Sequence, residues 1–207
     1  MRKKIDIELW ARKDHFQFFD SFEEPFFGVT VEVDCTRAYQ TAKSQGTSFF
    51  IYYLFASLQA ANQIDAFRYR IENGEVYLYD EIHASATIPR PNDTFGFSYM
   101  NYHASYSDFE KVAQQEITRV ANSTDLDPSG SGENVIHYSS LPWIKFTALS
   151  HARSYSFRNS CPKISFGKVV KTDNKRTMPV SIHVHHGLVD GSHVGQYVAL
   201  FQEIMNR

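Results

Sequence analysis

The segment MPVSIHVHHGLVDGSHVG, residues 178–195, carries the most regular pattern in the chain. Between residues 180 and 184 apolar and polar side chains alternate, which predicts a β-strand with one buried face. His186 continues the apolar face at the point where the chain leaves this strand. An Asp-Gly pair at residues 190–191 then predicts a turn into a last helix, which Ser192 is expected to cap.

The elements before this segment predict both strands and helices. Residues 163–171 and 177–186 flank a Thr-Asp-Asn turn and predict an antiparallel hairpin. Further strands are expected at residues 27–33, 75–79 (after the Asn73-Gly74 turn), 95–102 and 136–148. Helices are expected at residues 34–43, 47–64, 107–120 and 192–205, with caps at Asp34, Thr47 or Ser48, Ser107 with Glu110, and Ser192. Strands and helices do not alternate regularly, so we expect an α/β fold with a mixed sheet and helices packed on it.

Composition limits the class of protein. A length of 207 residues suits one domain, residues 1–207, and 17 Phe with 12 Tyr indicate a large core or an apolar pocket. The formal charge of −2 argues against a nucleic-acid partner.

The N-terminus has no leader-like apolar stretch, and the longest apolar run, residues 49–56, is too short to span a bilayer. Two cysteines form no disulfide framework, so we expect a reduced cytoplasmic protein without a membrane partner. Residues 122–134 predict one long surface loop.

The histidines of the segment allow three interpretations. They could be ordinary polar residues at a strand end. His183 and His185 share one face, as a metal-binding pair does, but no carboxylate or cysteine lies near them in sequence to complete a site. His186 faces the other way, and a histidine at a rigid strand end suits a general base. The chain contains no GxSxG, GxxxxGK[ST] or GxGxxG motif, so hydrolase and nucleotide-binding signatures give no support.

The same segment has a family resemblance. Residues 185–191, HHGLVDG, resemble the HHxxxDG signature of chloramphenicol acetyltransferases and of the wider coenzyme-A-dependent acyltransferases. Residues 9–19 are similar to that family's W-x-R-x-x-H-F-x-F-Y opening, and residues 60–68 to its A-x-N-x-x-x-x-x-R stretch. Residues 141–147 are similar to its L-P-W-x-x-F stretch. The four matches occur in order and cover almost the whole chain.

This resemblance implies a two-layer chloramphenicol-acetyltransferase-like fold and an acetyl transfer from acetyl-CoA to a hydroxyl group. His186 would be the general base that takes the proton of the acceptor hydroxyl, without an acyl-enzyme and without a metal. Asp190 would pair with Arg12 and hold the turn of the motif. The family also implies a homotrimer, in which His186 of one subunit faces the acceptor pocket of the next.

One position departs from the family pattern. Where the family has a serine whose hydroxyl stabilises the oxyanion, this chain has Ala148. The resemblance assigns four phenylalanines and a serine to the acceptor pocket, namely Phe18, Phe19, Phe27, Phe95 and Ser165, and it places Lys168 at the coenzyme A entrance. The alternative to a chloramphenicol-type enzyme is a relative that binds coenzyme A or a small molecule without catalysis, or with an altered acceptor. Ala148 is the feature that favours this alternative.

Overall fold

The computed structural model describes residues 1–126, 132–153 and 159–207. Within them, seven strands form a mixed sheet in the order β2-β10-β8-β7-β5-β6, with β9 paired to β10 beside this path. β7 is parallel to β5 and β8, and the other neighbours are antiparallel. The strands are β2 (Phe26–Asp34), β5 (His83–Pro89), β6 (Phe95–Phe97), β7 (Val135–Leu141), β8 (Lys163–Gly167), β9 (Val170–Thr172) and β10 (Lys175–His185). A small second sheet has the order β1-β4-β3, from β1 (Arg2–Lys4), β4 (Glu75–Tyr79) and β3 (Tyr69–Glu72).

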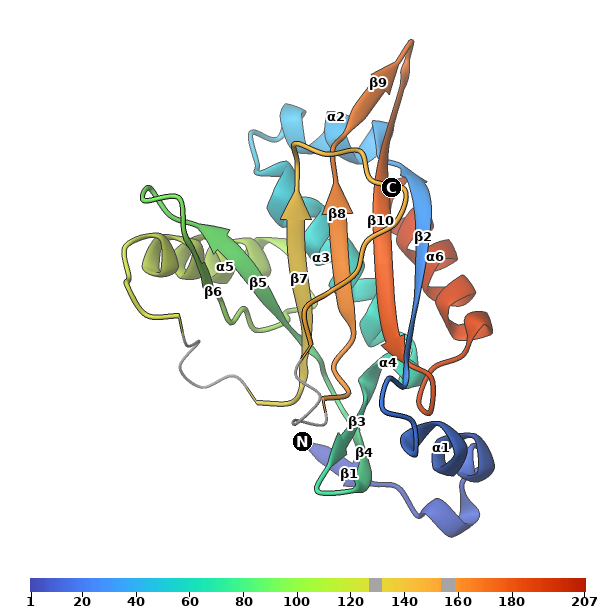
Figure 1. Ribbon diagram of the computed structural model, residues 1–207. Coiled ribbons are helices and arrows are strands. Elements are labelled where there is room, and N and C mark those ends of the chain that lie inside the picture. The colour runs from blue at the N-terminus through green and yellow to red at the C-terminus, as the bar shows by residue number, and fades with distance from the viewer. Residues whose placement is uncertain (127–131, 154–158) are drawn as a thin grey trace.

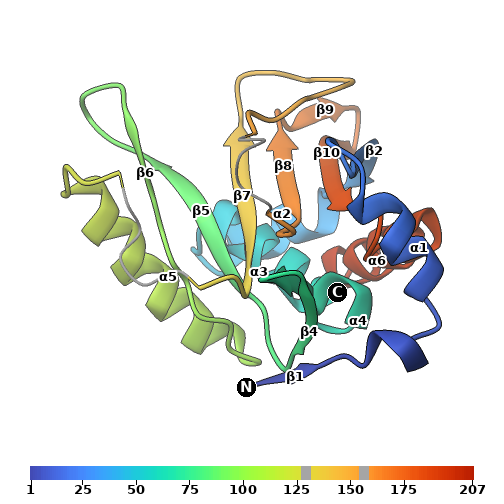
Figure 2. The same cartoon turned by 60° about the horizontal axis from the view of Figure 1, so that its bottom comes forward.

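The helices of the second layer lie on one face of the larger sheet. They include α2 (Thr36–Ser44), α3 (Phe49–Asn62), α5 (Tyr106–Ala121) and α6 (Gly191–Met205). Figure 1 shows α2, α3 and α6 behind the central strands, whereas residues 142–153, which follow β7, cross in front of them. The short helices η1 (Ile7–Leu9), α1 (Lys13–Asp20) and α4 (Asp65–Arg68) lie near one end of the sheet, and α1 lies beside the ends of β2 and β10 (Figure 2). The expected α/β fold with a mixed sheet and helices packed on it is confirmed.

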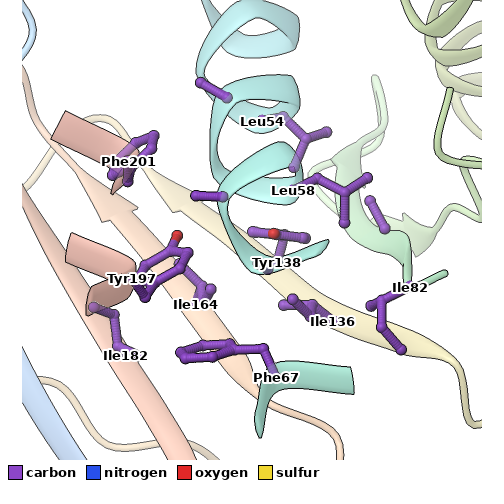
Figure 3. Packing of buried hydrophobic residues seen from close by; sticks show 14 of the residues in the cluster. Leu54, Leu58, Phe67, Ile82, Ile136, Tyr138, Ile164, Ile182, Tyr197 and Phe201 are labelled. Atoms are coloured by element: carbon purple, nitrogen blue, oxygen red, sulfur yellow. The ribbon is translucent and has the colours of Figure 1, made fainter. Parts of the chain in front are cut away.

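The core lies between this helical layer and the sheet. α3 is apolar nearly all round and is buried along most of its length, because α2, α5, α6 and the sheet surround it. Figure 3 shows Leu54 and Leu58 of α3 together with Tyr197 and Phe201 of α6 above the strands. All four side chains are inaccessible to solvent. Among the described residues, none of the helices combines the length and the apolar character that crossing a membrane requires.

The two faces of β10 differ in the way that its alternation predicts. Val180, Ile182 and Val184 are fully buried against the helical layer. Ser181 and His183 lie on the opposite face, where they pair in register with residues 165 and 163 of β8. The predicted hairpin is confirmed, but its first strand is split into β8 and β9.

Two predicted strands are shorter than expected. The strand predicted at residues 136–148 ends at Leu141, because Pro142 has no N–H to continue the ladder. The strand predicted at residues 95–102 ends at Phe97. There the hydroxyl of Ser98 accepts the N–H of residue 86 at 3.1 Å, so a side chain replaces a backbone carbonyl and the regular ladder stops.

Several helix starts also differ from the prediction. α6 begins at Gly191 with Asp190 as its N-cap, so the expected cap at Ser192 is wrong. α5 begins at Tyr106, which places the expected capping box of Ser107 and Glu110 inside the helix. Glu110 instead accepts a hydrogen bond from Thr47. The N-cap residue of α2 is Cys35 and not the expected Asp34, although the carboxylate of Asp34 accepts the N–H of Thr36 at 2.9 Å. The expected cap at Ser48 agrees with the structure, since Ser48 is the N-cap of α3. Strands β1, β3 and β5 were not predicted, and the centre of the predicted loop at residues 122–134 lies outside the described residues.

One buried hydroxyl group links the two layers and yields a test. Ser57 of α3 lies 3.0 Å from the hydroxyl of Tyr138 on β7 and 2.6 Å from that of Tyr197 on α6. Ser57→Ala leaves both phenols without this partner, and we expect it to lower the free energy of unfolding by about 1–3 kcal/mol. Tyr197→Phe keeps the hydrogen bond between Ser57 and Tyr138, so it should cost less. Denaturant unfolding at fixed protein concentration measures both values, and equal costs would contradict this account.

Candidate active site

His186 follows β10 directly, and two aromatic rings hold its imidazole. The ring stacks on Phe19 of α1 with centroids 4.0 Å apart and planes 9° apart, and it lies 4.5 Å from Phe27 of β2. Its backbone is fixed too, because its N–H donates to the carbonyl of Pro25 at 2.8 Å. Phe27 is the register partner of Val184, so His186 lies on the apolar face of β10, as the alternation predicts.

The imidazole presents one nitrogen to its own chain and the other outward. Nδ1 is buried and has no hydrogen-bond partner among the described residues, although it lies 3.5 Å from Oδ1 of Asp190. This separation is too long for the charge-orienting hydrogen bond of a serine-protease triad. The side chain is 34% exposed, and among the described residues Nε2 is neither buried nor hydrogen-bonded. Aromatic stacking therefore orients the ring, and Nε2 is the nitrogen that can meet a substrate.

An ion pair fixes the turn that follows His186. The guanidinium of Arg12 binds both carboxylate oxygens of Asp190, with Nη2 2.9 Å from Oδ1. The same guanidinium donates to the carbonyl of His186 at 3.2 Å and to that of Gly187 at 3.4 Å. The hydrogen bond from Arg12 holds the pKa of Asp190 below its usual value. The N-terminal segment thus ties down the backbone of the candidate base.

A second histidine, which the sequence did not single out as part of the site, completes this turn. His193 is the third residue of α6, and its Nδ1 accepts the backbone N–H of Asp190 at 3.0 Å. Burial lowers the pKa of His193, which keeps the ring neutral and its remaining proton on Nε2. The spacing of three residues between Asp190 and His193 is the signal that could have revealed this capping arrangement.

The structure brings only some of the predicted site residues together within one chain. Phe19 and Phe27 contact His186, while Phe18 meets the ring of Phe19 edge-on and is 60% exposed. Phe95 lies on β6, at the edge of the sheet opposite β2, and is 48% exposed.

The remaining predicted residues make no contact with His186 within the part of the chain that the structure describes. Ser165 is fully buried on β8 and pairs with Ser181, on the face opposite the candidate base. Lys168 is exposed, and its N–H donates to the carbonyl of Ile144. Ala148 is exposed and belongs to no strand, so the strand geometry expected for it is wrong.

The structure also separates the two histidines of the possible metal pair. The ring of His183 meets that of His151 edge-on at 4.8 Å, whereas Nδ1 of His185 accepts the N–H of Gly187 at 3.2 Å. In the part of the chain that the structure describes, no group of three His, Cys, Asp or Glu side chains is arranged to hold a metal ion.

This arrangement and the two-layer fold define a class, the coenzyme-A-dependent acyltransferases with an HHxxxDG turn. The family model described as chloramphenicol acetyltransferase matches residues 2–202. A chloramphenicol acetyltransferase of Proteus mirabilis is 28% identical over 200 residues, which are 96% of this chain and 92% of the relative. Chloramphenicol acetyltransferase 3 of Escherichia coli is 26% identical and covers 98% of this chain and 96% of its own.

Comparison with solved structures gives the same family. A chloramphenicol acetyltransferase structure matches with a TM-score of 0.90 and 34% identity over 99% of this chain and 100% of its own. A structure described as a probable dihydrolipoamide acetyltransferase from Listeria monocytogenes shares the fold alone, with a TM-score of 0.68 and 14% identity over 98% and 94% of the two chains. The chain therefore belongs to the chloramphenicol acetyltransferase family, whose members are acetyltransferases that use acetyl-CoA.

The Arg12–Asp190 ion pair should contribute strongly to stability. Arg12 is 14% and Asp190 32% exposed, so Arg12→Ala leaves a half-buried carboxylate and two carbonyls without their donor. We expect a loss near the lower end of about 3–5 kcal/mol in the free energy of unfolding. The neighbouring pair of Lys13 and Glu8 is more exposed, so Lys13→Ala should cost less than about 1 kcal/mol. Denaturant melts of both variants measure these costs, and similar values would refute the assigned role of the pair.

Proposed function

We propose that residues 1–207 act as one cytoplasmic acetyltransferase domain that transfers the acetyl group of acetyl-CoA to a hydroxyl group of a small acceptor, with His186 as general base. The observation that carries the proposal is the state of the imidazole. Its plane is fixed by Phe19, Nδ1 is buried, and Nε2 is open on a turn held by Arg12 and Asp190.

One general base is enough for both proton transfers of the proposed reaction. Nε2 of His186 takes the proton of the acceptor hydroxyl as the oxygen attacks the thioester carbonyl carbon. The tetrahedral intermediate collapses, the carbon–sulfur bond breaks, and the imidazolium returns the proton to the leaving thiolate. Coenzyme A and the acetylated acceptor then leave, and no acyl-enzyme forms. Fixing both reactants beside one imidazole contributes much of the rate acceleration.

We further propose a homotrimer with active sites between subunits. Four predicted site residues make no contact with His186 of their own chain among the described residues, namely Phe95, Ala148, Ser165 and Lys168. A neighbouring subunit would supply them to the candidate base, and Lys168 would lie at the coenzyme A entrance. Phe18, Phe19 and Phe27 would form the wall of the acceptor pocket that the base's own subunit contributes.

Removing the base tests the mechanism. In the His186→Ala variant the hydroxyl has no proton acceptor, and we expect the rate of acetyl transfer to fall by about 10²–10⁴-fold. His103→Ala removes a histidine from the loop before α5 and should leave the rate near that of the wild type. A thiol-release assay with acetyl-CoA and a panel of hydroxyl compounds, chloramphenicol included, measures both rates. Equal rates for His186→Ala and the wild type would exclude this mechanism.

The oxyanion position gives a second test. Ala148→Ser restores a hydroxyl where the family has one, and we expect kcat to rise by up to about 10²-fold while the KM for acetyl-CoA stays unchanged. An unchanged kcat would show that another group or a water already stabilises the oxyanion. Binding of coenzyme A in a thermal-shift assay, with no product from either protein, would instead favour the non-catalytic alternative.

A further inference from the structure

The sheet face opposite the helices carries a row of polar side chains from three adjacent strands. Lys163 on β8 is the register partner of His183 on β10 and of His137 on β7. Side chains of register partners point to the same face, so these three lie side by side. All three are half-buried, although no helix covers this face (Figure 1). Residues 142–153, which follow β7, cross it instead.

That crossing segment adds an imidazole and a guanidinium. The ring of His151 stands edge-on against His183 at 4.8 Å. The guanidinium of Arg153 lies 3.6 Å above the ring of Phe26, and the ammonium of Lys163 lies 4.7 Å from the same ring. Arg153 also pairs with Glu24. We call His137, His151, Arg153, Lys163, Ser165 and His183 the polar cluster.

The close fit of His183 shows that this arrangement is built into the fold. A Cβ atom at Gly28 would stand 2.1 Å from its Nε2. Glycine at position 28 therefore allows the imidazole to lie against strand β2. Since residue 28 is also the register partner of His183, both strands are shaped around this ring.

The polar cluster combines cationic side chains with neutral imidazoles that can donate hydrogen bonds. Burial lowers the pKa of His137 and of His151 to about 4, and it also lowers the pKa of His183. The three imidazoles are therefore uncharged at pH 7, and each offers one N–H. Lys163 has no ion pair within the described residues, and burial lowers its pKa as well. The carboxylate that acts on Lys163, that of Glu24, is already paired with Arg153, so the ammonium has no carboxylate of its own.

Two buried polar atoms of the cluster also lack a partner. The hydroxyl of Ser165 is fully buried, and among the described residues neither it nor Nε2 of His151 makes a hydrogen bond. Leaving such an atom unsatisfied costs about 1–3 kcal/mol. Acceptor oxygens that reached these atoms would satisfy them, and a bound anion would give Lys163 a counter-charge that it does not share with Arg153.

We propose that the polar cluster binds an anionic oxygen group, a carboxylate or a phosphate ester, carried by the acceptor. The proposal rests on the proposed function, because in the proposed trimer this face, which carries Ser165, would meet the neighbour's His186. The acceptor would then be a hydroxyl compound with a negative charge. Chloramphenicol, with a neutral nitrophenyl and amide group, offers Lys163 no counter-charge.

Kinetics with matched acceptors test the charge preference. We expect kcat/KM for acetyl transfer to be about 10- to 100-fold higher for the anionic member of each pair, such as glycerol 3-phosphate or glycerate against glycerol. Lys163→Met should abolish this preference, whereas Lys163→Arg and the exposed control Lys171→Met should retain it. Equal values for both members of every pair, or an unchanged preference in Lys163→Met, would overturn the proposal.

A binding experiment separates the failure of this proposal from that of acetyl transfer itself. Histidine ring resonances are followed by NMR while acetate or inorganic phosphate is added without acetyl-CoA. We expect saturable shifts for at least two of His137, His151 and His183 in the wild type and in Lys171→Met, but not in Lys163→Met. The two anions distinguish a carboxylate site from a phosphate site. Absence of saturable shifts with both would overturn the proposal even in an active enzyme, and shifts in an inactive protein would support the anion site alone.

Discussion

The ion pair between Arg12 and Asp190 joins the first and last parts of the chain. It connects the segment before α1 to the turn between β10 and α6, 178 residues further along. Because the same guanidinium also holds the carbonyls of His186 and Gly187, the position of the candidate base depends on a contact with the N-terminal segment. α1 is placed by this contact, and it brings Phe19 against the imidazole. The stability of the fold and the placement of the candidate base are therefore coupled at one guanidinium.

The division of work at this turn differs from that of a triad. A buried carboxylate hydrogen-bonded to the base would orient it and stabilise its charged form. Here both carboxylate oxygens of Asp190 are occupied by Arg12, and the imidazole is held by ring stacking. Stacking fixes the plane of the ring while its outer nitrogen stays free to exchange a proton. Such a base suits an acceptor that arrives from outside the subunit.

The two faces of the larger sheet differ in the side chains that they carry. One face carries Val180, Ile182 and Val184 against the helical layer and contributes to the core. The other carries serines and half-buried basic side chains, with fewer apolar contacts and unsatisfied polar atoms. A polar face of this kind adds less to stability than an apolar one would. Its retention inside the fold is consistent with a binding role.

The sequence by itself determined the local features. The alternation in β10, the helix from residue 49 onward and the Asn73-Gly74 turn, where both residues have positive φ, follow from patterns within a few residues. The motif resemblance located Arg12, His186 and Asp190. Only the tertiary structure decided what depends on distant partners: the stacking of Phe19 on His186, the cap formed by His193, and the clustering of Lys163 with three histidines. Strand order and register determine those neighbours, and no local pattern encodes a contact between strands that are far apart in the chain.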